Sequence, residues 1–130
     1  MEKPHKKLLC WQKSVDLSVL IYKLTERFPR EGIYGLTSQM RRAAVSAPAN
    51  ISEGAADRSK DEFRNFLRIA IGSLNELGTL MEISRRVGYL KPEESANAQK
   101  LLDECLALTF GLRRSLSSSA HRSPLTAHQS

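Results

Sequence analysis

The chain has 130 residues, and 20 Lys and Arg residues against 14 Asp and Glu residues give it a formal net charge of +6. This length suits one domain with one hydrophobic core. No apolar run is long enough to span a membrane, and the N-terminus lacks the apolar segment of a signal peptide, so we expect a cytoplasmic protein without membrane contact. Aromatic residues make up only 6% of the chain, which favours packed helices over a β-sandwich.

The first predicted helix spans residues 8–28, where apolar side chains recur at helical spacing. Its main stripe consists of Leu17, Ile21, Leu24 and Phe28. Further apolar residues, Val15, Val19 and Tyr22, lie on other faces and exceed what one bundle seam needs. They indicate a second buried surface and therefore self-association. The stretch FPREGIYG ends this helix.

The second predicted helix spans residues 35–54, and its apolar stripe is made largely of alanines. Pro48 stands in its middle, cannot donate to the carbonyl of Ala44, and costs roughly 3 kcal/mol in an ordinary helix. A polar flank beside the proline contains Arg42, Ser46, Asn50 and Glu53. We expect a kinked helix whose polar flank bonds the freed carbonyl or a neighbouring helix. A binding site at this flank is the alternative.

The third and fourth predicted helices span residues 59–87 and 92–116. Ser59 and Glu62 have the spacing of a capping box at the start of the third helix, and Pro92 suits the first turn of the fourth. Short connections favour antiparallel neighbours, so residues 1–116 are predicted to form an up-and-down four-helix bundle. Residues 117–130 have little apolar content and are predicted to be disordered.

Two groups of basic residues bear on function. One group lies in the predicted last turns of helices, where cations stabilise the helix dipole: Arg27, Arg85, Arg86, Arg113 and Arg114. The other group, besides Lys3, Lys6 and Lys7, is left for contacts with nucleic acid: Arg41, Arg42, Arg58, Lys60, Arg64 and Arg68. A merely solvated surface is the alternative for this second group.

No catalytic constellation is evident. His5, His121 and His128 fall in the expected flexible ends, and no phosphate-binding loop is present. Arg122 and His128 have a spacing found in some helical-bundle ribonucleases, but Pro124 stands between them in the predicted tail. Cys10 and Cys105 lack metal-ligand spacing. We therefore expect no enzyme activity, no metal, no cofactor and two buried free thiols.

Three stretches resemble a known family: WQKSVDLSVLIYKLTERFP, YGLTSQMRRAAVSAPANISEG and EFRNFLRIAIGSLNELGTLMEISRRVGYL. They are similar to the four-helix-bundle proteins encoded in intervening sequences of bacterial large-subunit ribosomal RNA genes, often labelled S23 ribosomal protein. The resemblance implies a ring-like homopentamer without established enzyme activity. A related branch serves diversity-generating retroelements, where a basic pentamer binds nucleic acid and a reverse transcriptase.

The family motif falls on residues of the second and third helices. These are Arg41, Arg42, Ser46, Pro48, Asn50, Glu53 and Gly54, followed by Ser73 and Glu76. The chain departs from the common pattern at Ala47, Asn75 and Gly78, which affects local packing. We expect a non-enzymatic homo-oligomer that binds RNA, DNA or a ribonucleoprotein, with a reverse transcriptase or ribosomal component as a further partner. The alternative is a protein-binding scaffold or accessory subunit without nucleic-acid contact.

Overall fold

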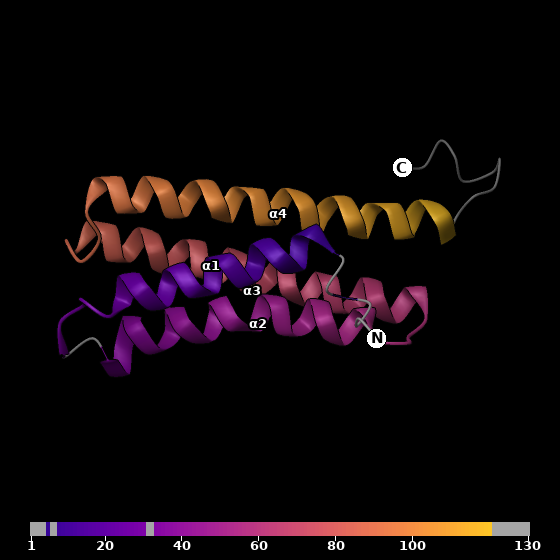
Figure 1. Ribbon diagram of the computed structural model, residues 1–130, viewed down its shortest axis with the longest axis horizontal. Helices are drawn as coiled ribbons and strands as arrows, with labels where there is room; N and C mark the ends of the chain where they lie inside the picture. Colours follow the sequence, from indigo (N-terminus) through magenta and orange to yellow (C-terminus); the bar gives the residue numbers. More distant parts are fainter. Residues whose placement is uncertain (1–4, 6–7, 31–32, 121–130) are drawn as a thin grey trace.

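Four α-helices pack side by side in the computed structural model of the chain, which describes residues 5, 8–30 and 33–120. They are α1 (Leu9–Thr25), α2 (Ser38–Ala55), α3 (Lys60–Arg86) and α4 (Pro92–Ala120), with a short π-helical segment, η3 (Ile33–Thr37), before α2. Consecutive α-helices pack together and α1 also packs against α4, while Figure 1 shows the chain reversing direction between them. Over the described residues the fold is all-helical, which confirms the predicted antiparallel four-helix bundle.

The connection between the first two helices is longer than the sequence predicts. Helix α1 ends at Thr25 instead of residue 28, and the Phe28 N–H donates to the Thr25 carbonyl in a turn. The following Pro29 explains the early end, because the residue before a proline is disfavoured in helical geometry. Helix α2 begins at Ser38 instead of residue 35, since the backbone at Gly35 leaves helical geometry with φ −114° and ψ −110°.

Helix α4 continues to Ala120, four residues beyond its predicted end. No proline or glycine interrupts residues 117–120, and they continue the helix. Residues 121–130 lie outside the described residues. The longer helix also changes the account of Arg113 and Arg114, because no basic residue occupies the last turn of α4. Their expected role at the helix dipole is therefore wrong, whereas Arg85 and Arg86 do occupy the last turn of α3.

Helix α3 begins with the predicted capping box. Ser59 Oγ accepts a hydrogen bond from the Glu62 N–H at 3.1 Å, and the Glu62 carboxylate accepts one from the Ser59 N–H at 3.0 Å. These bonds satisfy two backbone donors at the helix end. The Ser59 N–H is the main cause that lowers the pKa of Glu62, followed by the Ser59 side chain.

The core consists of two clusters of buried apolar side chains. The larger cluster is built around Leu17, Ile21, Met40, Leu74, Leu77, Met81 and Leu102, together with the alanine stripe of α2. The smaller cluster contains Cys10, Ile51, Leu67 and Ala70. Small residues keep the helices close: a methyl group at Gly54 would lie 2.7 Å from Phe66 Cβ, and one at Gly78 would lie 3.1 Å from Leu102 Cδ2. These two glycines therefore permit close helix approach.

Pro48 is buried inside α2, which runs through it as one helix. The carbonyl of Ala44, which has lost its helical donor, accepts a hydrogen bond from Ser18 Oγ at 2.8 Å. Ser18 belongs to α1 and is itself buried. The donor that offsets the proline thus comes from a neighbouring helix and not from the polar flank of α2. Of the two predicted roles for the polar flank, bonding the freed carbonyl is therefore wrong, whereas bonding a neighbouring helix is confirmed at Ser46, whose Oγ lies 2.7 Å from Ser73 Oγ of α3.

Candidate nucleic-acid interface

The six predicted nucleic-acid contacts lie at two opposite ends of the bundle. Arg41 and Arg42 are at the start of α2, whereas Arg58, Lys60, Arg64 and Arg68 surround the start of α3. Helix α2 has 18 residues and is therefore about 27 Å long at 1.5 Å per residue. Arg41 and Arg42 are therefore separated along the bundle from Arg58, Lys60 and Arg64, and Lys3, Lys6 and Lys7 lie outside the described residues.

Arg41 is held between α1 and α2. Its Nε donates to Thr25 Oγ1 at 2.8 Å, and a terminal nitrogen donates to the Tyr22 carbonyl at 3.3 Å. The guanidinium also lies 4.5 Å from the centre of the Tyr22 ring. These contacts satisfy carbonyl and hydroxyl groups at the end of α1, so the residue joins two helices. Much of its hydrogen-bonding capacity is therefore unavailable to a ligand.

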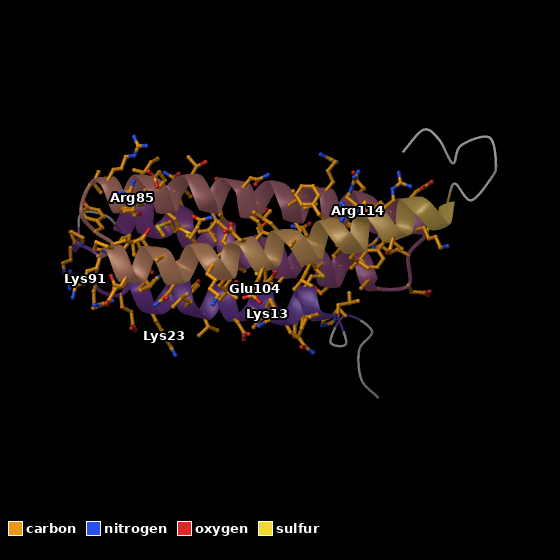
Figure 2. All side chains as sticks on the ribbon, turned by 90° about the horizontal axis from the view of Figure 1, so that it is seen from above. Lys13, Lys23, Arg85, Lys91, Glu104 and Arg114 are labelled. Atoms are coloured by element: carbon orange, nitrogen blue, oxygen red, sulfur yellow. The ribbon has the colours of Figure 1, made fainter. Side chains whose placement is uncertain are left out.

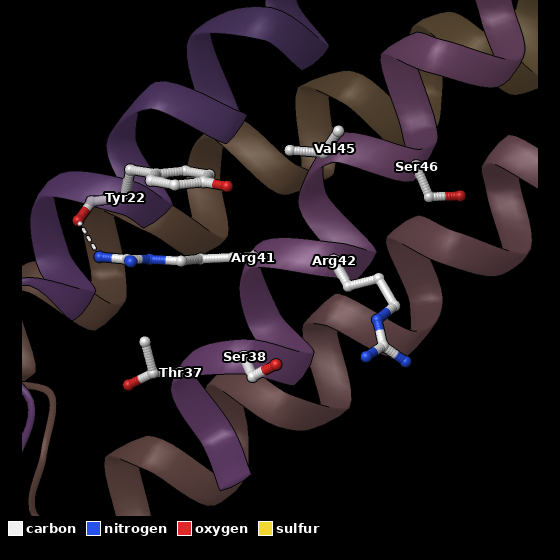
Figure 3. A pocket seen from close by; sticks show the side chains of 7 residues that line it. All are labelled: Tyr22, Thr37, Ser38, Arg41, Arg42, Val45 and Ser46. Atoms are coloured by element: carbon white, nitrogen blue, oxygen red, sulfur yellow. Dashed lines mark hydrogen bonds between the residues drawn. The ribbon is translucent and has the colours of Figure 1, made fainter. Parts of the chain in front are cut away.

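Arg42 lines a shallow groove between α1 and α2, drawn in Figure 3. We name this the α1–α2 groove; its walls include Tyr22, Arg41, Arg42, Val45 and Ser46, and Val19 extends it along α1. Val19, Tyr22 and Val45 are 48%, 44% and 43% exposed. Arg42 is exposed and has no hydrogen-bond or ion-pair partner among the described residues. An apolar floor beside a free cation is typical of an interaction surface.

Four arginines come together where the start of α3 meets the last part of α4. Arg113 Nε donates to the backbone carbonyl of Arg64 at 3.3 Å, which brings the two helices into contact there. Arg68 lies one turn beyond Arg64 on the same side of α3, and Arg114 adjoins Arg113. We name these four residues the basic cluster. Figure 2 shows Arg114 far from Arg85 and Lys91, which lie at the opposite end.

The basic cluster carries more cations than carboxylates. Arg64 pairs with Asp61 at 2.8 Å, and its Nε is buried without a hydrogen-bond partner. Arg68 bonds only the neutral amide oxygen of Asn65, at 3.0 and 3.2 Å. The two arginines of α4 have no carboxylate partner in the described part of the chain. The cluster therefore retains about three uncompensated positive charges.

Two other residues near α3 are predicted to contact nucleic acid, and they differ in how many partners they have within the chain. The guanidinium of Arg58 lies 4.9 Å from the Phe66 ring centre, pairs with Glu53 at 2.5 Å and approaches Glu62 at 3.8 Å. Lys60 is exposed at the first position of α3. Arg58 thus mainly secures the connection between α2 and α3, while Lys60 adds charge to this end.

The polar residues around Pro48 divide into one network and two separate side chains. Ser46 Oγ and Ser73 Oγ lie 2.7 Å apart and link α2 to α3, and Asn50 Nδ2 donates to the Ser46 carbonyl at 2.8 Å. Glu53 belongs to the Arg58 contact. Glu76 is exposed on α3 without an ion-pair partner in the described residues. The network joins α2 to α3.

The cysteines and the one histidine that the structure describes are buried or packed against a neighbouring side chain. Cys10 and Cys105 are buried free thiols, as predicted, and burial raises the pKa of Cys105 to about 11. His5 packs edge-on against Trp11, with 4.8 Å between ring centres, instead of lying in a flexible end. His121, Arg122 and His128 lie outside the described residues. Among those that are described, no three metal-ligating side chains gather, and no helix is long and apolar enough to cross a bilayer.

Sequence reasoning missed Arg113 and Arg114 as members of the basic cluster. Their assignment to a last helical turn depended on ending α4 at residue 116. The available signal was the absence of a helix breaker before Pro124. Their contact with α3 was not available from sequence, because it joins residues 49 positions apart.

The fold and the basic cluster together define a small antiparallel four-helix-bundle protein with a cationic surface at one end. The family model described as 23S rRNA-intervening sequence protein matches residues 6–111, and the chain belongs to this family. It is also similar to a crystal structure from Bacteroides thetaiotaomicron, described as a protein with unknown function from the S23 ribosomal protein family. The two chains are 25% identical with a TM-score of 0.76, over 82% of this chain and 96% of that one. A comparison with curated proteins found no match.

Proposed function

We propose that this protein is a non-enzymatic, cytoplasmic homo-oligomer that binds nucleic acid, as RNA or a ribonucleoprotein, through the basic cluster. The observation that carries the proposal is the meeting of four arginines from α3 and α4 around a single carboxylate. Cations that neutralise phosphates release condensed counterions, which supplies affinity without reading bases. Lys60 extends this surface.

The α1–α2 groove supports the self-association part of the proposal. Three apolar side chains there are more than 40% exposed in the single chain, and burying them against a second copy would stabilise an assembly. Following the family resemblance, we propose a homopentamer. Its mass by light scattering should be five times the chain mass of 14.6 kDa.

A paired substitution tests the groove. Replacing Val19 and Val45 with serine should lower the mass, whereas Val87→Ser, which is 55% exposed outside the groove, should leave it unchanged. A monomeric wild-type protein at tens of micromolar, or equal behaviour of both variants, would contradict this part of the proposal.

Direct binding tests the nucleic-acid part. Fluorescence anisotropy with a labelled 30-nucleotide RNA in 50 mM salt should show binding that weakens when Arg68, Arg113 and Arg114 become glutamine. A control that changes net charge equally replaces Arg30, Lys91 and Lys100, which are exposed and lie outside the basic cluster. No binding of RNA or DNA at low salt would refute the proposal. Recovery of a protein partner after nuclease treatment would then favour the scaffold alternative.

A further inference from the structure

Phe110 lies in α4 and is 44% exposed. Other rings of the bundle have partners: Phe66 is covered by the Arg58 guanidinium, and Phe28 packs against Tyr89 with 5.3 Å between ring centres. No ring or guanidinium stacks on Phe110 in the described part of the chain. An exposed aromatic ring in a helix interior leaves apolar surface in contact with water, and this surface is available to a partner.

The surroundings of Phe110 are those of the basic cluster. Arg113 and Arg114 follow it by three and four residues and therefore lie one turn away on the same side of α4. Two contacts fix the pairing of α3 with α4: Gly78 approaches Leu102, and the Arg64 carbonyl accepts from Arg113. Between these contacts, Phe110 lies at the level of Arg68. The ring thus shares a side of α4 with two cations and lies at the level of a third on α3.

We propose that the basic cluster binds single-stranded nucleic acid and that Phe110 is the platform on which one unpaired base stacks. This inference rests on the proposed function and names its ligand class. An aromatic ring beside cations that track a phosphate backbone is the arrangement with which proteins hold single strands, because every base presents a π-face. In a duplex the bases are already stacked on one another, so the same ring gains nothing from their faces.

The charges and the ring contribute in different ways. The arginines bind any phosphate backbone, single- or double-stranded, with a strength that falls as salt rises. The ring adds an uncharged contact that requires an unstacked base. Removing the ring should therefore change the preference between single and double strands while leaving the salt dependence unaltered.

The test compares wild-type protein with Phe110→Ala on two labelled probes of equal length, oligo-uridine and an RNA duplex. Base stacking measured by alanine substitution corresponds to about a 5- to 150-fold change in affinity. Phe110→Ala should weaken oligo-uridine binding at least fivefold and duplex binding less than twofold. Phe110→Trp should restore single-strand binding, and its added fluorescence should be quenched by the oligonucleotide. Ile83→Ala, which removes a 43% exposed side chain at the other end of α3, is the control and should change neither affinity.

Four outcomes would overturn the inference. They are an unchanged affinity of Phe110→Ala for oligo-uridine, an equal loss for both probes, a loss of single-strand affinity in the Ile83→Ala control, and a reduced mass of the Phe110→Ala assembly. The last would make Phe110 part of a subunit interface. In the first three cases, binding by the wild-type protein leaves the proposed function standing. If the wild-type protein binds neither probe at low salt, the proposed function itself fails.

Discussion

The hydrogen bond from Ser18 to the Ala44 carbonyl gives a sharp test of how α2 tolerates Pro48. Ser18→Ala removes the donor that, among the described residues, replaces the missing helical N–H, and it does so in a buried position. A buried carbonyl left without a partner costs about 1–3 kcal/mol. We therefore expect Ser18→Ala to lower the free energy of unfolding by about that amount.

The same substitution should cost little when residue 48 can donate. In a Pro48→Ala background the new N–H can bond the Ala44 carbonyl, so this carbonyl keeps a hydrogen-bond partner after Ser18→Ala. The double-mutant cycle should give a coupling of at least about 1 kcal/mol. Pro48→Ala also removes buried apolar atoms, and the cycle cancels this unrelated effect.

Urea denaturation followed by circular dichroism measures all four proteins, with equal slopes as the condition for comparison. Ser52→Ala is a matched control, because its hydroxyl donates to the Ala49 carbonyl at 2.9 Å on the exposed side of α2, and it should cost less than about 0.5 kcal/mol. The reasoning is refuted if Ser18→Ala lowers the free energy of unfolding equally with proline and with alanine at position 48.

Three further predictions concern packing and pH. Gly54→Ala should destabilise the fold by about 1–3 kcal/mol, because the added methyl group would lie 2.7 Å from Phe66 Cβ. Gly72→Ala should instead raise the free energy of unfolding by about 0.5–1 kcal/mol, since nothing lies within 4 Å of its new methyl group. Hydrogen bonds from Arg85 and then Arg86 lower the pKa of Glu82 from 4.5 to about 2. Its stabilising contribution should be complete above pH 4.5 and lost as the pH falls through 2, and Glu82→Gln should reduce that dependence.

Thermal and urea unfolding at fixed pH check the two glycine variants, and unfolding between pH 2 and 6 checks the Glu82 variant. A Gly54→Ala protein as stable as the wild type would show that α2 and α3 can separate freely. A destabilised Gly72→Ala protein would show that another surface packs at that position. Identical acid profiles for wild type and Glu82→Gln would remove the arginine pairing as a source of acid sensitivity.

Much of the fold follows from local patterns in the sequence. The capping residues Ser59 and Glu62 mark the start of α3 correctly because their bonds join residues only three positions apart. Helical spacing likewise predicted the buried alanines Ala43, Ala44 and Ala47. A neighbouring helix approaches closely at Gly78, whereas nothing in the described chain lies within 4 Å of a methyl group at Gly72. Helical periodicity shows which face of a helix carries small residues, but not whether another helix packs against that face.

The candidate site was less predictable because its contacts are not local. Arg41 donates hydrogen bonds to Thr25 and Tyr22 of the neighbouring helix α1. Its guanidinium is therefore largely occupied within the bundle, although the sequence predicts that it contacts nucleic acid. Arg113 and Arg114 enter the site only once α4 is known to continue past residue 116. The helix dipole explains a basic residue in the last turn of a helix. That explanation applies only where the end of the helix is known, and the sequence placed the end of α4 four residues too early.

The salt dependence of binding tests the central claim most directly. For single strands each neutralised phosphate contributes about 0.7 to the slope of log affinity against log salt. Replacing Arg68, Arg113 and Arg114 with glutamine should therefore lower the magnitude of that slope by about 2 between 50 and 200 mM salt. The control triple at Arg30, Lys91 and Lys100 should keep the wild-type slope. Equal slopes for the wild type and both variants would contradict binding through the basic cluster.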